Sequence, residues 1–392
     1  MMNEPDPVRR ADPASPVSLI HSDAADAGAH LEPGIALCLS GGGYRAMLFH
    51  VGTLWRLNDF GYLPKLARVS SVSGGSITAG VLGLNWSRLD FAQNGVATNL
   101  TSLVVDPVRQ LASITIDAES ILGGIALPGS IAERVAAEYR KYLFGHSTLQ
   151  DLPDTPRFVF NATNVQSGAL WRFSKPFMAD YRVGVLKSPR TELAVAVGAS
   201  SAFPPVLSPV ELRLESSDFD PESGLDLQRE PFTTQVLLTD GGVYDNLGLE
   251  TAWKKFQTVL VSDAGGKMAA EEEPKRDWVR HARRILDLVD NQVRSLRKRQ
   301  VIQSFKDGVR EGAYWGIRTN ILDYELADAL ECPFDQTTNL ANTPTRLKRL
   351  DSPVQDRIIN WGYAVCDAAM RKHVDQSLPR PSAFPYPGSA VG

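Results

Sequence analysis

The chain has 392 residues, of which 43% are hydrophobic, so it is long enough and apolar enough to bury a large core. Its formal net charge of −4 argues against bulk affinity for nucleic acid. Three widely spaced cysteines suggest neither a disulfide framework nor a CxxC-type metal site, and they favour a reducing compartment.

The ends of the chain differ in composition from its middle. Residues 1–30 are rich in proline, alanine and aspartate, and we expect them to be disordered. No stretch has the apolar length of a signal peptide or of a membrane-spanning helix. We therefore expect a cytoplasmic protein, with any membrane contact peripheral, built as one domain over residues 31–375 and a loose, proline-rich tail over 376–392.

The first predicted strand is the apolar run at residues 35–39, typical of a strand covered on both faces. Residues 40–46 read Ser-Gly-Gly-Gly-Tyr-Arg-Ala, and helical spacing follows from Met47. This loop lacks the lysine and hydroxyl residue of a P-loop, and alanine replaces the last glycine of a dinucleotide fingerprint. Three consecutive glycines instead offer unhindered backbone N–H groups, which suit an anion-binding nest or oxyanion hole. A flexible turn with no role is the alternative.

A second strand ends at a tight corner near residue 72. Ser73, Gly74 and Gly75 occupy the corner, and helical spacing resumes after them. The pattern indicates a nucleophile elbow, in which the serine side chain projects beyond the end of the sheet. Gly74 leaves room for the bend and for a substrate. Ser71 stands where the usual G-x-S-x-G pattern has its first glycine, so ordinary turn chemistry competes with this interpretation.

The middle of the chain is expected to be mostly helical up to residue 152. A capping-box pattern at residues 130–133 predicts a helix start, and Gly145 predicts its end. The apolar stretch at 121–129 is either a flap over an acyl-chain pocket or a buried connector. A hairpin is predicted from 157–162 and 170–173, followed by a helix at about 192–201.

Two later apolar strands, at residues 235–239 and 258–262, each end in an aspartate followed closely by glycines. Reactive residues of open α/β sheets gather beyond the carboxyl ends of strands, which makes Asp240 and Asp263 candidate catalytic acids. Asp245 is a weaker candidate.

A long helix is predicted at residues 278–299, with an apolar stripe on one face and seven basic residues on the others. Such a helix either meets anionic lipid headgroups or packs on a core with its charged faces in solvent. A final helix is expected at about 353–373.

The glycine loop, the Ser73 corner and the Asp-Gly-Gly turn at residue 240, in this order, resemble the patatin-like phospholipases. This family includes the plant patatin lipid acyl hydrolases and is related to cytosolic phospholipase A2. The likeness extends from about residue 34 to about residue 373, and residues 199–205 resemble the family's Ala/Ser-rich helix that ends before prolines. It implies an α/β fold: a three-layer α/β/α sandwich with a central, mostly parallel sheet.

The resemblance also implies a serine acyl hydrolase that cleaves fatty-acyl esters of phospholipids or related lipids. No cofactor or metal is expected, because the acids and glycines lack a histidine or cysteine cluster, and the sequence does not determine whether calcium or an activator is required. The implied site consists of a nucleophile, an acid that completes a Ser-Asp dyad, an oxyanion hole and substrate-binding residues. By this resemblance, Ser73 is the nucleophile and Asp240 is the acid. The oxyanion hole consists of Gly41, Gly42 and Gly43. Arg45 and Gly74 bind the substrate, with bracing of the glycine loop as the alternative role for Arg45. The sequence departs from the family at Ser71 and at Ser40, where many members carry aspartate.

Two rival functions remain at this stage. A Ser-His-Asp hydrolase would draw its histidine from His146, His281 or His373, which follow Ser73 in the chain. His50, in the helix after the glycine loop, is expected to be a packed or capping residue instead. The second rival is a lipid-binding or membrane-scaffolding protein that has the fold without the activity. The sequence does not determine the oligomeric state.

Overall fold

The computed structural model describes residues 31–116, 131–204 and 207–392. Its strands are β1 (Glu32–Leu39), β2 (Leu66–Ser71), β3 (Arg157–Asn164), β4 (Leu170–Phe173), β5 (Phe177–Asp180), β6 (Gly184–Lys187), β7 (Val210–Arg213), β8 (Gln235–Asp240), β9 (Phe256–Asp263) and β10 (Glu311–Gly316). Its α-helices are α2 (Gly43–Asp59), α3 (Gly74–Asn85), α4 (Asp106–Ala112), α6 (Ile131–Tyr139), α7 (Leu193–Ser200), α8 (Gly242–Asp245), α9 (Glu250–Trp253), α10 (Trp278–Lys306), α11 (Phe334–Ala341) and α12 (Ser352–His373).

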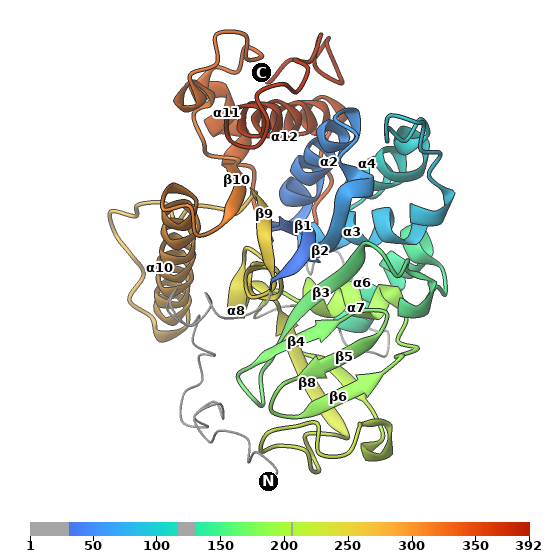
Figure 1. Cartoon of the computed structure of the whole chain (residues 1–392). Helices are drawn as coiled ribbons and strands as arrows, with labels where there is room; N and C mark the ends of the chain where they lie inside the picture. The colour runs from blue at the N-terminus through green and yellow to red at the C-terminus, as the bar shows by residue number, and fades with distance from the viewer. Residues whose placement is uncertain (1–30, 117–130, 205–206) are drawn as a thin grey trace.

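All of these strands belong to one mixed sheet with helices on both faces (Figure 1). Strands β10, β9, β1, β2 and β3 are parallel neighbours and form one side of it, with β10 at the edge. Strands β4, β5 and β6 extend it antiparallel from β3, while β8 also pairs with β3 and carries β7. The expected α/β fold and the predicted hairpin of β3 and β4 are confirmed.

The two faces of β1 show why its sequence is a continuous apolar run. Leu37 and Leu39 face the larger core, whereas Ala36 and Cys38 face a second core built with α9, β9 and the end of α10. Alternate residues of a strand point to opposite faces, so a strand between two helical layers has to be apolar at every position.

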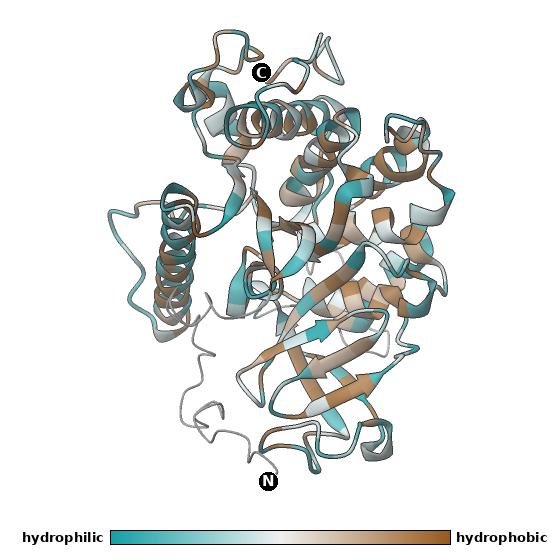
Figure 2. Ribbon diagram, in the orientation of Figure 1, coloured by the Kyte–Doolittle hydropathy of each residue, from teal (hydrophilic) through white to brown (hydrophobic). Residues whose placement is uncertain are grey.

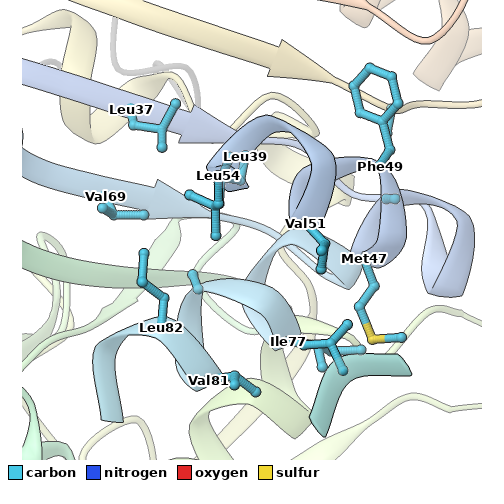
Figure 3. Packing of buried hydrophobic residues seen from close by; sticks show 14 of the residues in the cluster. Leu37, Leu39, Met47, Phe49, Val51, Leu54, Val69, Ile77, Val81 and Leu82 are labelled. Carbon is cyan, nitrogen blue, oxygen red and sulfur yellow. The ribbon is translucent and has the colours of Figure 1, made fainter. Parts of the chain in front are cut away.

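Figure 3 shows the larger core where α2 and α3 meet β1 and β2. The Met47 side chain reaches toward Ile77, and Leu54 lies beside Val69, whereas Phe49 points away from this group. Phe49 lies on the side of α2 that packs against α12, where Gly362 of α12 approaches its backbone. A Cβ on Gly362 would lie 2.0 Å from the Phe49 carbonyl oxygen, so glycine is required at this helix contact.

The C-terminal tail is not loose as predicted. The Asn360 amide on α12 donates to the carbonyls of Tyr386 (2.8 Å) and Ala390 (2.6 Å) and accepts the Tyr386 N–H. Val391 is buried. A buried asparagine therefore helps to hold the tail, because its side chain supplies hydrogen bonds to the tail's irregular backbone.

The remaining predictions have mixed outcomes. Helices α2, α7, α10 and α12 lie where the spacing predicted them, and α6 runs through a π-helical turn to Gly145. The predictions for residues 1–30, 121–129 and Ser130 lie outside the described residues. Within the described ranges, no helix combines the length and apolar character needed to cross a bilayer.

Helix α10 does not pack its apolar stripe on the core, so that alternative is wrong. Only Val301 and Ser304 of this 29-residue helix are buried. Eight large apolar residues on it are exposed: Trp278, Val279, Ile285, Leu286, Leu288, Val289, Val293 and Leu296. Figure 2 shows hydrophobic and hydrophilic segments alternating along α10, which stands at the side of the molecule. The surface of a soluble monomeric protein rarely exposes so many large apolar side chains in one place.

Candidate active site

Ser73 sits at a strained corner between β2 and α3. Its φ of 52° and ψ of −122° lie where a non-glycine residue is costly, and it is 8% exposed. The corner is too crowded for side chains at the next two positions. A Cβ on Gly74 would lie 2.2 Å from the Gly43 carbonyl oxygen, and one on Gly75 would lie 2.5 Å from the Leu39 carbonyl oxygen. A strand, a strained corner and a helix follow one another here, which is the local structure that a nucleophile elbow requires.

A set of buried hydroxyl groups accommodates Ser71, which replaces a glycine beneath this corner. The Ser71 hydroxyl donates to the Val159 carbonyl at 3.4 Å and accepts from the Ser76 hydroxyl at 3.0 Å. Ser76 also contacts the Ser200 hydroxyl at 2.8 Å. Because the Ser71 hydroxyl is hydrogen-bonded, this polar side chain is accommodated in a buried position.

Asp240 ends β8 in a fully buried position. Its Oδ1 accepts the Gly242 N–H at 2.7 Å, whereas Oδ2 is buried without a hydrogen bond to any described residue. Burial raises the pKa of the carboxyl from 3.8 to about 7, while the Gly242 N–H and the nearby Ser73 side chain oppose the rise. A carboxyl group whose pKa lies near neutrality, and which has one oxygen free of hydrogen bonds, can serve as a base.

The corner and the turn after β8 are held together by Ser200 at the end of α7. Its carbonyl accepts the Ser73 N–H at 3.1 Å and the Gly241 N–H at 3.3 Å, and its hydroxyl also accepts the Ser73 N–H at 3.1 Å. The Ser200 hydroxyl then donates to the Asn161 carbonyl at 2.7 Å. Ser73 and Asp240, which are far apart in the sequence, thus reach one edge of the sheet.

The glycine loop joins the same edge through Asn246. The Gly41 N–H donates to the Asn246 carbonyl at 3.1 Å, and a Cβ on Gly41 would lie 3.1 Å from the Ser73 Cβ. The N–H groups of Gly42 and Gly43 have no hydrogen-bond partner among the described residues. They lie at the N-terminus of α2, where unpaired N–H groups favour negative charge.

Arg45 braces the loop rather than facing a substrate. It is 3% exposed, and its guanidinium donates to the Ala264 carbonyl, the Thr343 carbonyl and the Thr345 hydroxyl. Burial lowers its pKa to about 10, and nearby Arg318 and Arg294 add to the effect. Of the two roles expected for Arg45, these contacts favour bracing, because the guanidinium is buried and each of its three nitrogens already donates to the protein.

The histidines of the rival triad make other contacts. His146 is exposed and hydrogen-bonds with Glu192 at 3.1 Å, His281 is exposed on α10, and His373 packs on the ring of Tyr324. His50 is fully buried between the Ser262 hydroxyl and the Ser40 carbonyl, both at 2.9 Å. Burial lowers its pKa to about 4, which keeps it neutral, as a packed histidine should be.

The two other candidate acids are engaged. Asp245 accepts the N–H groups of Leu247 and Glu250. Asp263 accepts the Gly265 N–H at 2.8 Å and the Tyr314 hydroxyl at 2.6 Å. Both acids hold local structure with both oxygens.

Sequence reasoning missed Ser200 and Asn246 as organisers of the site. Each had a local signal: Ser200 lies in the Ala-Ser-Ser-Ala segment before Phe-Pro-Pro, and Asn246 follows the Asp-Gly-Gly turn by four residues. Their hydrogen bonds join segments far apart in the chain, and spacing alone does not disclose such contacts. Among the described residues, no group of three histidine, cysteine or acidic side chains could hold a metal ion.

A family model described as patatin-like phospholipase matches residues 37–253 of this chain. Among solved structures, human GIVD cytosolic phospholipase A2 in complex with methyl gamma-linolenyl fluorophosphonate matches at 13% identity and a TM-score of 0.49, over 86% of this chain and 57% of that chain. Another structure of the human protein matches at 14% identity and a TM-score of 0.38, over 59% of this chain and 45% of that chain.

VipD from Legionella pneumophila matches at 14% identity and a TM-score of 0.34, over 86% of this chain and 66% of that chain. The matches span about half the length of the cytosolic phospholipase A2 chains. No curated protein matches the sequence at a comparable level.

Proposed function

Because this chain belongs to the family of patatin-like phospholipases, we propose that it hydrolyses fatty-acyl esters of phospholipids or related lipids through a dyad of Ser73 and Asp240. The family supports lipid hydrolysis in general. One combination of features supports the dyad. Ser73 is strained and barely exposed, while the pKa of the Asp240 carboxyl is raised to about 7 and its Oδ2 has no hydrogen bond to a described residue.

The first step is attack on the ester carbonyl. As the Ser73 oxygen bonds to the carbonyl carbon, Asp240 takes the hydroxyl proton. Its pKa near 7 suits this task, because a base near the working pH combines a useful ionised fraction with a useful affinity for the proton. The carbonyl oxygen becomes an oxyanion.

The Gly42 and Gly43 N–H groups are assigned to this oxyanion. Both are unpaired at the start of α2, and each well-placed donor contributes about 3 to 4 kcal/mol to such a transition state. The Gly41 N–H already donates to Asn246, so Gly41 is assigned to shaping the loop. When the intermediate collapses, Asp240 returns the proton to the leaving alcohol and an acyl-serine remains. A water molecule, deprotonated by Asp240, then attacks the acyl carbon; as the fatty acid leaves, Asp240 returns the proton to the Ser73 oxygen and restores the hydroxyl.

Labelling with methyl gamma-linolenyl fluorophosphonate, followed by mass mapping of the modified residue, tests the nucleophile. We expect phosphonylation at Ser73 and none in Ser73→Ala, whose release of fatty acid from phospholipid falls at least about 10⁴-fold. Ser102→Ala, which changes an exposed serine, is the control and retains both. Modification of another serine, or full activity in Ser73→Ala, would refute the dyad.

Helix α10 supports a membrane contact for the same protein. It carries eight exposed large apolar residues together with eight basic and two acidic residues, a combination that suits an anionic lipid surface. Vesicle sedimentation of Ser73→Ala tests this contact. Adding Leu286→Ser, Val289→Ser and Val293→Ser should abolish binding to vesicles containing phosphatidylglycerol, whereas the exposed control Leu322→Ser should not.

The same helix also favours the second candidate function, a lipid-binding scaffold. Binding of the wild type to vesicles without release of fatty acid from any ester would establish that alternative. A dimer that disappears in the triple serine variant would instead show that a second copy covers the stripe.

A further inference from the structure

A series of hydrogen bonds runs through the core behind the glycine loop, from β10 to the residue that precedes the glycines. The Trp315 Nε1–H donates to the Thr53 hydroxyl at 3.1 Å, and that hydroxyl contacts the Ser262 hydroxyl at 3.1 Å. The Ser262 hydroxyl contacts His50 Nδ1, and His50 Nε2 contacts the Ser40 carbonyl, both at 2.9 Å. All five residues have an exposed fraction of 0%. Polar groups buried so deeply are tolerated because each of them is paired.

The two ends of this series determine the direction of every hydrogen bond in it. The Trp315 indole can only donate, and the Ser40 carbonyl can only accept. His50 therefore carries its proton on Nε2 and accepts the Ser262 hydroxyl proton at Nδ1, a neutral form that agrees with its lowered pKa of about 4. The Thr53 hydroxyl then donates to Ser262. Because all of these bonds point the same way, they strengthen one another and hold the Ser40 carbonyl in place.

The peptide bond between Ser40 and Gly41 is held at both of its polar groups. Its carbonyl accepts from His50 at 2.9 Å, and its N–H donates to the Asn246 carbonyl at 3.1 Å. The same peptide lies against the corner between β2 and α3, since a Cβ on Gly75 would be 2.7 Å from the Ser40 carbonyl oxygen. Removing the His50 donor therefore releases one end of a peptide that packs directly on this corner.

The next peptide bond, between Gly41 and Gly42, carries one of the N–H groups assigned to the oxyanion. The Ser40 hydroxyl donates to its carbonyl at 3.3 Å and accepts the Ala264 N–H at 2.7 Å. The N–H and C=O of a planar trans peptide point in opposite directions, so a held carbonyl also sets the direction of the Gly42 N–H. That N–H, like the one of Gly43, has no partner among the described residues. The fixed part of the loop thus ends where its free donors begin.

We propose that His50 and Ser40 are positioning residues that aim the N–H groups of the oxyanion hole at the carbonyl attacked by Ser73, an inference that rests on the proposed hydrolase function. Donors that are already aligned stabilise the oxyanion because they need not reorient as its charge develops. Their alignment acts on the transition state rather than on the bound ester, so its loss lowers kcat and leaves KM nearly unchanged. Both residues act through the backbone of the loop.

The test compares His50→Phe, which keeps a ring and removes the donor, with His50→Gln, whose amide N–H can reach the Ser40 carbonyl. We expect kcat for fatty-acid release to fall about 10²-fold in His50→Phe, with KM nearly unchanged, and most of that loss to be recovered in His50→Gln. Ser40→Ala should lower kcat about tenfold in the same way, and it tests the proposal even if His50→Phe does not fold. The matched control is Asn58→Leu, which removes two buried hydrogen bonds with Ala97 at the other end of α2 and leaves kcat unaffected.

A long-chain alkyl trifluoromethyl ketone separates positioning from a merely structural role. The Ser73 oxygen bonds to its carbonyl carbon, the hydroxyl proton passes to Asp240, and the carbonyl oxygen becomes a hemiketal oxyanion that meets the same N–H groups without turnover. We expect its inhibition constant to rise in His50→Phe by the factor by which kcat/KM falls. The inhibition constant of a dialkyl ether phospholipid, which forms no oxyanion, should stay the same.

The outcomes distinguish this proposal from the proposed function. Equal weakening of the two inhibitors in His50→Phe, or an unaffected kcat in both His50→Phe and Ser40→Ala, would overturn the positioning role. A wild type that forms the hemiketal but releases no fatty acid from any ester would contradict the proposed hydrolase. In that case, weaker binding of the ketone to His50→Phe, with unchanged binding to Asn58→Leu, still supports the positioning role.

Discussion

The turns after β8 and β9 have similar sequences, but the pKa of the aspartate is raised in the first turn and lowered in the second. Each follows an apolar strand, opens with an aspartate and contains glycines. Asp240 has one N–H partner, and burial raises its pKa to about 7. Burial also acts to raise the pKa of Asp263, but Arg294 and the Tyr314 hydroxyl outweigh it and the net pKa is lowered. A carboxyl buried without a neighbouring cation has a raised pKa and can act as a base, whereas a carboxyl buried beside a cation and hydrogen-bond donors stays ionised.

The largest expected effect is the loss of activity in Asp240→Asn. An amide of the same shape cannot accept the Ser73 proton, so we expect fatty-acid release to fall at least about 10⁴-fold. Asp263→Asn is the matched control, and its activity should fall much less, because Asp263 has no proposed role in proton transfer. Steady-state assays of both purified variants decide this, and equal losses would erase the distinction between the two turns.

The pH dependence of activity should report Asp240 and not Asp263. The base has to be ionised, so kcat/KM should fall about tenfold for each pH unit below the Asp240 pKa of about 7. The lowered pKa of Asp263 leaves that group ionised throughout this range. A soluble ester measured between pH 5 and pH 9 provides the profile. A flat profile from pH 5 to pH 8 would contradict Asp240 as the base.

Stability should depend on pH in opposite ways at the two acids. The folded pKa of Asp240 is raised above 3.8, so the folded state retains a proton and loses stability as pH rises from about 4 to about 7. The penalty grows by at most about 1.4 kcal/mol per pH unit. Urea denaturation at pH 8 should therefore find Asp240→Asn more stable than the wild type, with the gain disappearing near pH 4.

Asp263 gives the opposite sign. Its folded pKa is lowered, so its stabilising contribution is present above 3.8 and is lost as pH falls through the lowered pKa. Asp263→Asn should be less stable than the wild type at neutral pH. A gain in stability for Asp263→Asn, or none for Asp240→Asn at pH 8, would show that the environments differ less than their contacts indicate.

The smallest expected effect concerns the strained corner that accompanies Asp240 and has no counterpart beside Asp263. Ser73→Gly should stabilise the fold by about 1 to 2 kcal/mol relative to Ser73→Ala, because glycine adopts a φ of 52° without strain. Both variants lack the hydroxyl, so the comparison isolates the backbone. Equal midpoints in urea denaturation would mean that the corner stores no strain.

Much of the fold could be read from local patterns. The continuous apolar runs of β1 and β9 indicated strands covered on both faces, and the stripes of α2 and α12 indicated helices. The tail misled the prediction because its proline content indicates irregular backbone but does not reveal that Asn360 supplies hydrogen bonds to it. The apolar stripe of α10 was also misinterpreted. Periodicity indicates an amphipathic helix, but it does not show whether protein, lipid or water covers the apolar face.

By itself, the sequence determined the parts of the candidate site: a serine at a strand-to-helix corner, an acid after an apolar strand and a row of glycines before a helix. Residue type and close spacing encode such turns, because they depend on local sterics. Only the tertiary structure decided which acid is the candidate base, which glycine N–H groups remain free, and that Arg45 faces inward. Those properties depend on burial and on partners brought from distant segments, such as Ser200, Asn246 and Arg294, and spacing along the chain does not record these contacts.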